Sequence, residues 1–219
     1  AEVRLPAYLE RSEPQRIDAR AGVLAPVKGS TVALVATANR ALASARVDGA
    51  DVAPQGATVH ARPIEVADER KVTIEWRDDH GLDGQRPLVV QVSPRVDEAP
   101  TLALSGLPAG RDILLSSDTL RFTIGVADDF GIRRVGIQWE GDAGENGQAP
   151  ERGERPLMAG GPDQAALDVA ATFCPDALGV RPQPLVIRAF AEDYLPGRGR
   201  VFSTPFLVYV VDKAEHALV

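Results

Sequence analysis

Apolar and polar residues alternate with a period of two along most of the chain, which is typical of β-strands with one buried face. The stretch DTLRFTIGVA places Leu120, Phe122 and Ile124 on one face and Arg121 and Thr123 on the other. The stretch STVALVATA alternates in the same way. Further strands are predicted at Lys71–Trp76, Leu88–Val92, Val135–Trp139, Leu185–Phe190 and Phe206–Val211.

Turn-forming residues separate these strands and leave little room for helices. The chain has 20 glycines and 17 prolines, which are spread between the alternating runs. The best helical candidate is one turn or two near Pro175–Leu178. The pattern therefore predicts an all-β protein.

The predicted strands recur in the same order in the two halves of the chain. STVALVATANRALASARVDG matches DTLRFTIGVADDFGIRRVGIQWEG, and KVTIEWRDDHGLDGQRPLVVQVSP matches PLVIRAFAEDYLPGRGRVFSTPFLVYVVD. An internal repeat of this kind indicates two copies of one β-unit. Short strands with turn signals every ~8–12 residues favour an immunoglobulin-like sandwich for each copy. We expect two tandem immunoglobulin-like β-sandwich domains, at residues 1–93 and 97–219, with the boundary in SPRVDEAPTLAL.

The second copy carries an additional stretch rich in glycine and proline, EGDAGENGQAPERGERPLMAGGPDQ, at residues 140–164. We interpret it as a long loop or hairpin inserted into the second domain.

Composition restricts the partners of the chain. The 24 basic and 31 acidic residues give a formal charge of −7, which disfavours nucleic acid and anionic membrane surfaces, because both need a basic face. The longest apolar run, FLVYVV, is far shorter than the ~20 residues of a membrane span. The first residues do not have the pattern of a signal peptide. We therefore expect a segment of a longer protein, with contact to a membrane only through parts outside this chain.

The letters DFG at Asp129–Gly131 also mark the magnesium-binding motif of protein kinases. A kinase would need a catalytic loop, a glycine-rich loop and a strand lysine as well, and the sequence shows none of them. We interpret the motif as a turn at a strand end, where Phe130 points inward and Gly131 supplies conformational freedom.

Six carboxylates are candidates for a shared site, because the turns that carry them lie at one end of an immunoglobulin-like sandwich. Oxygen ligands of this kind suit Ca²⁺. Four arginines follow them closely in sequence, and they favour a structural network of ion pairs over a metal. The acids are Asp97, Glu98, Asp128, Asp129, Glu192 and Asp193, and the arginines are Arg133, Arg134, Arg198 and Arg200. Both alternatives stay open at this point.

Other chemistry is weakly supported. The single cysteine, Cys174, has no histidine at a recognisable spacing and is interpreted as a structural residue. Trp76 and Trp139 each end a predicted strand, where packing is the expected role and ligand stacking the alternative. We assign no catalytic, cofactor-binding or metal-binding residue and expect no enzyme activity.

Three stretches together carry a resemblance to a known group: PAYLERSEPQRIDARAGVLAPVKGSTVALVATANRALASARVDG, VADDFGIRRVGIQWEG and IRAFAEDYLPGRGRVFSTPFLVYVVDKAEHA. They resemble a β-rich segment of large, uncharacterised envelope proteins of planctomycete- and verrucomicrobia-type bacteria. The resemblance covers nearly the whole chain, and AEDYLPGRGR, followed by Glu215–Ala217, is its most specific part. It implies a periplasmic or extracytoplasmic segment of a membrane-anchored protein and no catalytic residue.

The sequence thus predicts a non-catalytic extracytoplasmic spacer or protein-interaction module with an unidentified protein partner. The alternative is a carbohydrate- or cell-wall-binding module, which would present two or three exposed aromatic rings, with Trp76, Trp139 and Tyr194 as candidates. An enzyme is a third interpretation, which would need a deep pocket with converging polar groups.

Overall fold

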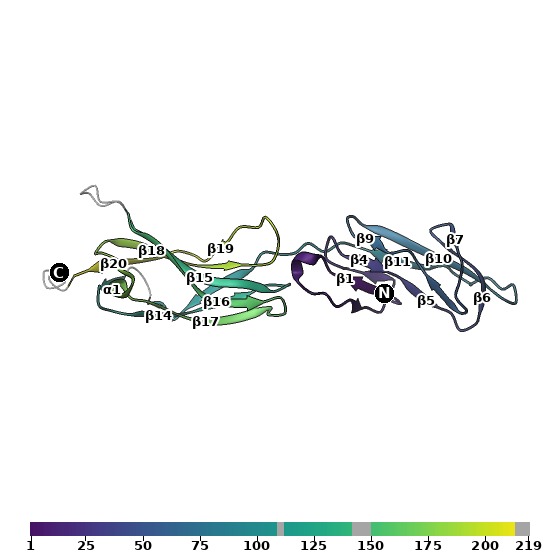
Figure 1. Cartoon of the computed structure of the whole chain (residues 1–219), viewed down its shortest axis with the longest axis horizontal. Helices are drawn as coiled ribbons and strands as arrows, with labels where there is room; N and C mark the ends of the chain where they lie inside the picture. The colour runs from purple at the N-terminus through teal and green to yellow at the C-terminus, as the bar shows by residue number, and fades with distance from the viewer. Residues whose placement is uncertain (109–111, 142–149, 213–219) are drawn as a thin grey trace. The chain divides into compact units, whose positions relative to one another are not determined.

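The computed structural model describes residues 1–108, 112–141 and 150–212, and its regular structure is almost entirely β-strand (Figure 1). The chain divides into two compact units, Ala1–Asp97 and Glu98–Val219. Each unit has a hydrophobic core of its own. Neither helical element in the described part of the chain has the length and apolar character needed to cross a membrane.

The first unit is built from short strands. They are β1 (Glu2–Arg4), β2 (Gln15–Arg16), β3 (Val23–Leu24), β4 (Thr31–Ala33), β5 (Val35–Thr37), β6 (Leu42–Val47), β7 (Ala50–Val52), β8 (Thr58–His60), β9 (Ile64–Glu65), β10 (Arg70–Asp78) and β11 (Leu88–Val92), with a 3₁₀ turn at Ala7–Leu9. One layer has the order β2-β1-β4-β9 together with the β5–β8 pair, and the other has the order β3-β11-β10-β6-β7. Val3 and Val32 from the first layer share the core with Ile74 and Val90 from the second.

The second unit has longer strands. They are β12 (Thr101–Ser105), β13 (Asp112–Leu115), β14 (Leu120–Ala127), β15 (Ile132–Gly141), β16 (Arg152–Gly161), β17 (Ala166–Phe173), β18 (Pro184–Glu192), β19 (Val201–Phe202) and β20 (Phe206–Val211), with the helical turn α1 at Pro175–Leu178. One layer has the order β12-β14-β17, and the other has the order β13-β20-β18-β15-β16, with β19 beside β18. Ile124, Ile137 and Leu185 are buried between the layers.

The two units share one strand arrangement. The orders β3-β11-β10-β6-β7 and β13-β20-β18-β15-β16 correspond strand for strand. In both, a strand from the start of the unit pairs in parallel with the last strand, β3 with β11 and β13 with β20. Two packed sheets of this kind, otherwise antiparallel, make each unit an immunoglobulin-like β-sandwich. The matching strands β10 and β18 are those that the sequence repeat aligns.

The alternating pattern predicted most of the long strands, but it missed β16 and β17 and the short strands of the first unit. Leu88–Val92, Phe206–Val211 and the helical turn at Pro175–Leu178 have the predicted bounds. The stretch STVALVATA forms two strands instead of one. β4 pairs with β1 and β9, the chain leaves this sheet at Leu34, and it continues as β5, which pairs with β8.

The stretch at residues 140–164, expected as a long loop or hairpin, contains ten residues of regular strand. Residues 142–149 lie outside the described part of the chain, but Arg152–Gly161 pairs with β15 as the edge strand β16. Its side chains stay exposed or half-buried throughout, so the hydrophobic alternation that marks a core strand is weak. The stretch Glu215–Ala217 also lies outside the described residues.

Candidate functional site

The turn that contains Asp129–Gly131 joins β14 to β15. Phe130 is only 6% exposed. Gly131 has a φ of +116°, a backbone conformation that residues with a side chain rarely adopt. One carboxylate oxygen of Asp128, Oδ2, accepts hydrogen bonds from the backbone N–H groups of Phe130 (2.9 Å) and Gly131 (2.8 Å). The predicted role of this motif as a strand-end turn is what the geometry shows.

The carboxylate of Asp128 is perturbed by its surroundings. Burial raises its pKa, the two backbone hydrogen bonds oppose the shift, and the nearby charges of Asp129 and Asp193 raise the pKa further. Its second oxygen, Oδ1, is buried and has no hydrogen-bond partner among the described residues. The surroundings of Asp128 therefore disfavour its charged form relative to water.

Glu192, at the end of β18, lies between two arginines. Arg134 on β15 donates to both of its oxygens, at 2.7 and 3.1 Å, and Arg200 donates to Oε1 at 2.8 Å. Arg200 also forms an ion pair with Glu154 on β16. The hydrogen bond from Arg134, followed by that from Arg200, lowers the pKa of Glu192. These residues form a compact ion-pair network on the second unit.

Asp193 belongs to a separate pair with Arg198. Its side chain is buried, and Arg198 donates to its carboxylate and to the backbone oxygen of Glu98. The backbone N–H of Glu98 donates to Asp129 Oδ1 at 3.3 Å. The start of the second unit is thereby tied to both turns.

The carboxylates named from the sequence lie in both units, and those of the second unit fall into two groups. Asp97 belongs to the first unit, where Tyr8 donates its hydroxyl to it at 3.0 Å. In the second unit, Asp128, Asp129 and Asp193 lie close together, whereas Glu192 belongs to the network with Arg134 and Arg200. Three of the four arginines pair with these acids as expected. No group of three or more histidine, cysteine or acidic side chains within the described residues has an arrangement that could hold a metal ion.

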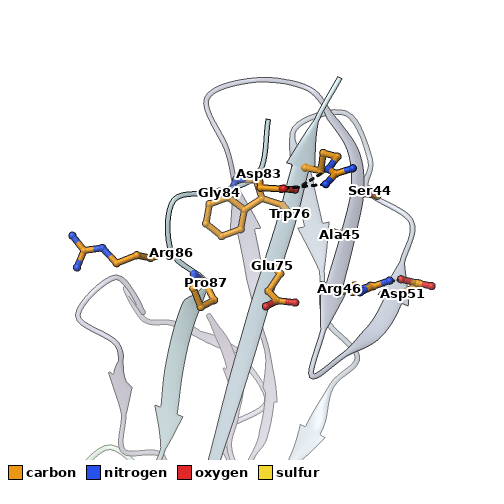
Figure 2. A pocket seen from close by; sticks show the side chains of 11 residues that line it. Ser44, Ala45, Arg46, Asp51, Glu75, Trp76, Asp83, Gly84, Arg86 and Pro87 are labelled. Atoms are coloured by element: carbon orange, nitrogen blue, oxygen red, sulfur yellow. Dashed lines mark hydrogen bonds and ion pairs between the residues drawn. The ribbon is translucent and has the colours of Figure 1, made fainter. Parts of the chain in front are cut away.

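A polar hollow of about 570 Å³ lies on the first unit, along the outer face of β6, β7 and β10 (Figure 2). Two ion pairs border it, Arg46 with Asp51 at 2.9 Å and Arg77 with Asp83 at 2.7 Å. The hydrogen bond that Arg46 donates to Asp51 raises the pKa of Arg46, and the one that Arg77 donates to Asp83 raises the pKa of Arg77. The hollow offers paired charges of both signs rather than a field of one sign.

Trp76 lies at the base of this hollow, with its ring beside Gly84 (Figure 2). A Cβ on Gly84 would come within 2.7 Å of the ring, so the Gly84 backbone covers the ring closely. The rest of the ring packs against the core of the first unit. Trp139 is 7% exposed and contacts Phe173 edge to face, and Tyr194 is half-buried. These three aromatic residues do not form an exposed stacking platform.

A second cavity, of about 400 Å³, opens between the layers of the first unit on the other side of Trp76. Its lining is mainly apolar and includes Ile17, Val35, Leu42 and Leu88, with the Asp18–Arg20 ion pair among the lining residues. The polar hollow depends on how the segment between β10 and β11 folds back, because Asp83, Gly84, Arg86 and Pro87 line it. The sequence offered one signal for this, the glycine-bearing turn HGLDGQRP after Trp76.

Glu154 is the member of the ion-pair network that the sequence prediction missed. It lies in the stretch expected as a loop, and only the pairing of β16 with β15 brings it to Arg200. The alternating charges of ERGER were the available signal, because they are typical of a solvent-exposed edge strand.

No protein-family model matches the chain, and no curated protein is similar to it in sequence. Several solved structures are similar in fold. Fibronectin(III)-like modules of Clostridium thermocellum CbhA are 14% identical, cover 85% of this chain and 87% of their own, and have a TM-score of 0.28. A DUF3823 family protein from Bacteroides ovatus is 12% identical over 81% and 98%, with a TM-score of 0.33. The tandem immunoglobulin domains A164–A165 of titin are 10% identical over 85% and 91%, with a TM-score of 0.28. The likeness carries no inference about function.

Proposed function

We propose that the chain is a non-catalytic, extracytoplasmic spacer and protein-interaction module of a larger membrane-anchored protein. The observation that carries this proposal is the parallel pairing within each unit of an early strand with the last strand, β3 with β11 and β13 with β20. Because these two strands run in the same direction, the early strand begins and the last strand ends at opposite ends of the unit. Each unit thus adds its own length to the protein, as a spacer requires.

The same pairing makes each unit resistant to tension. A pull on the two ends of a unit loads the hydrogen bonds between the parallel strands together, in shear, instead of opening them one after another. The isolated bridge between Val27 and Arg95 extends the β3–β11 pairing in the first unit. The ion pairs of Glu192 and Asp193 hold the strand ends of the second unit.

Single-molecule stretching of the chain between its two ends tests the proposal. A spacer of two independent sandwiches should give two separate rupture events. They should release roughly 30 nm for Ala1–Asp97 and roughly 40 nm for Glu98–Val219, from the ~3.6 Å that an extended residue spans. A gradual extension without two events would contradict it.

The extracytoplasmic location is supported by the resemblance to envelope proteins and needs its own test. Ser117 is exposed in the turn after β13, and Cys174 is the only cysteine of the chain. The parent protein with Cys174→Ala and Ser117→Cys should react with a membrane-impermeant maleimide in cells whose inner membrane is intact. Reaction only after lysis of that membrane would contradict the proposed location.

The carbohydrate-binding alternative gains no support from the aromatic residues. A saccharide stacks on an exposed ring face, and Gly84 covers the ring of Trp76 while Trp139 is buried. Binding of cell-wall saccharides to the isolated chain, lost with Trp76→Ala in a folded variant, would restore that interpretation.

A further inference from the structure

The strand β17 has one free edge. It pairs with β14 on one side and ends its sheet on the other. The backbone N–H of Asp128 donates to the oxygen of Ala165 at 2.8 Å. This bond shows which residue pairs of β14 and β17 are hydrogen-bonded and which are not, because the two kinds alternate in an antiparallel pair. The backbone groups that form hydrogen bonds with β14 are therefore those of Leu167, Val169 and Ala171. Their neighbours in sequence turn their backbone groups to the free edge, and these are Ala166, Asp168, Ala170 and Thr172.

This edge lacks the features that usually protect a strand from pairing with another chain. The eight residues of β17 contain no proline, no glycine and only one charged side chain. The edge strand β16 of the same unit does have such features. Pro156 interrupts it, the four residues before Pro156 are charged or glycine, and its pairing register shifts opposite Val135 and Gly136. In the first unit the corresponding edge is broken into β8 and β9, with Pro63 between them.

The edge carries one charge of each sign, and within the described residues neither has an ionic partner. Asp168 is exposed near the middle of β17 and forms no ion pair with a described residue. At the other end, Arg155 donates to the backbone oxygen of Thr172 and lies 3.3 Å from its hydroxyl. Arg155 pairs with no carboxylate of the described residues, and its Nε is buried without a hydrogen-bond partner.

We propose that the free edge of β17 binds the same edge of a second copy of this chain, antiparallel, so that the two three-stranded sheets become one continuous sheet. The register that uses every outward-facing residue pairs Asp168 with Ala170 of the other copy, and Ala166 with Thr172, whose backbone oxygen also accepts a hydrogen bond from Arg155. It avoids placing the two Asp168 side chains opposite each other. The diagonal neighbours of each Asp168 in the other copy are Asp168 and Thr172, and the guanidinium of Arg155 beside Thr172 offsets the repulsion between the two carboxylates.

This complementarity favours a second copy over an unrelated strand. An antiparallel pair of identical strands is two-fold symmetric. Asp168 of each copy therefore lies near Arg155 of the other, and the contact occurs twice in the dimer. Arg121 lies on β14 opposite Thr172 and adds positive charge at the same place. The proposal goes beyond the spacer role, since the stretching result for a single chain does not depend on it.

Sedimentation of the whole chain over a range of concentrations tests the proposal. The wild type should show a reversible monomer–dimer equilibrium. Asp168→Arg and Arg155→Glu should each weaken dimerisation about tenfold or more, because each places like charges together. The double variant Asp168→Arg with Arg155→Glu should recover most of the loss, which simple misfolding of either variant would not allow.

Two further variants separate pairing from folding. Ala170→Pro removes a free-edge N–H, which an edge strand tolerates, and should abolish the dimer while the melting temperature stays near that of the wild type. Ala170→Thr keeps the N–H and should retain the dimer. Asp68→Arg, an exposed site on the first unit, controls for the change in charge. A wild type that stays monomeric at every concentration, or a dimer unaffected by Asp168→Arg and Ala170→Pro, would overturn the proposal.

Discussion

The guanidinium carbon of Arg200 lies 4.2 Å from the centre of the Phe190 ring. The same guanidinium pairs with Glu192 and Glu154, so one side chain joins an aromatic core residue to carboxylates on β18 and β16. Arginine has the planar, multi-donor group that this triple contact needs, and lysine does not. The arrangement explains why an acid-rich strand end can be stable without a metal ion.

Replacement of this arginine by lysine should therefore destabilise the second unit. Arg200→Lys keeps the charge but loses the bridge between Glu192 and Glu154, and we expect a loss of about 1–2 kcal/mol in the free energy of unfolding. Urea unfolding measures it, with Trp139 as the fluorescent reporter in a Trp76→Phe background. Arg133→Lys, at an exposed position of β15, is the matched control and should change little. Equal effects of the two substitutions would contradict the assigned role.

The stability of the second unit should depend on pH through Glu192. Its pKa is lowered in the folded state, chiefly by Arg134, so its contribution is present above the unfolded pKa and is lost as pH falls through the folded pKa. Glu192→Gln should thus cost stability at pH 7 and much less near pH 3. Unfolding of both proteins at the two pH values measures the difference. The exposed Asp176→Asn serves as the control. A cost that does not shrink at low pH would count against the network.

A close backbone approach limits substitution at Gly136. A Cβ at this position would meet the Phe190 ring at 2.4 Å and the backbone oxygen of Arg155 at 2.8 Å. Gly136→Ala should destabilise the second unit by about 1–3 kcal/mol through overpacking. Gly199→Ala is the control, because a Cβ there meets nothing within 4 Å. Thermal unfolding measures the effect, and the melting temperature of Gly136→Ala should be the lower of the two. Similar melting temperatures for both variants would show that Phe190 can move aside freely.

The raised pKa of Asp128 predicts opposite effects for two substitutions. Burial is the main cause of the shift, so the charged form opposes folding at pH 7, and the contribution of this group to stability falls as pH rises through its folded pKa. Asp128→Asn keeps an oxygen for Phe130 and Gly131 without the charge, and should match or exceed the wild type at pH 7. Asp128→Ala removes the acceptor and should cost about 1–2 kcal/mol. Chemical denaturation compares them.

The same pair of proteins tests the calcium alternative. If Asp128 were a metal ligand, Ca²⁺ would raise the melting temperature of the wild type and leave Asp128→Asn unchanged. The ion-pair account predicts no response to Ca²⁺ in either protein.

The fold was predictable where one face of a strand is buried. The strand β14 alternates strongly because every second residue enters the core, whereas β20 was marked by its continuous apolar run. Pro175 and Gly179 mark the two ends of α1, with Gly179 in the left-handed region. The edge strand β16 was not recognised, because it buries no face fully and its proline and glycines are typical of loops. The two-residue strands β2, β3, β9 and β19 are too short for any periodicity to appear.

The site was predictable in its chemistry and less so in its geometry. The sequence pointed to arginines near the acids, and Arg134, Arg198 and Arg200 do form pairs there. It could not assign partners, since adjacent residues on a strand point to opposite faces. Glu192 and Asp193 accordingly belong to different pairs. The polar hollow beside Trp76 depends on the return of the chain to Gly84, which no local pattern encodes.

The parallel pairing of β13 with β20 is the central structural claim, and the direction of pulling tests it most directly. In a Cys174→Ala background, attachment through Val96→Cys and Asp212→Cys loads this pair in shear, because the chain then enters and leaves the second unit at opposite ends. Attachment through Ser117→Cys and Asp212→Cys pulls at the same end of the pair, beyond Leu115 and Val211, and should open its bonds one at a time. The account predicts a rupture force several-fold higher in the first geometry. Equal forces in the two geometries would contradict it.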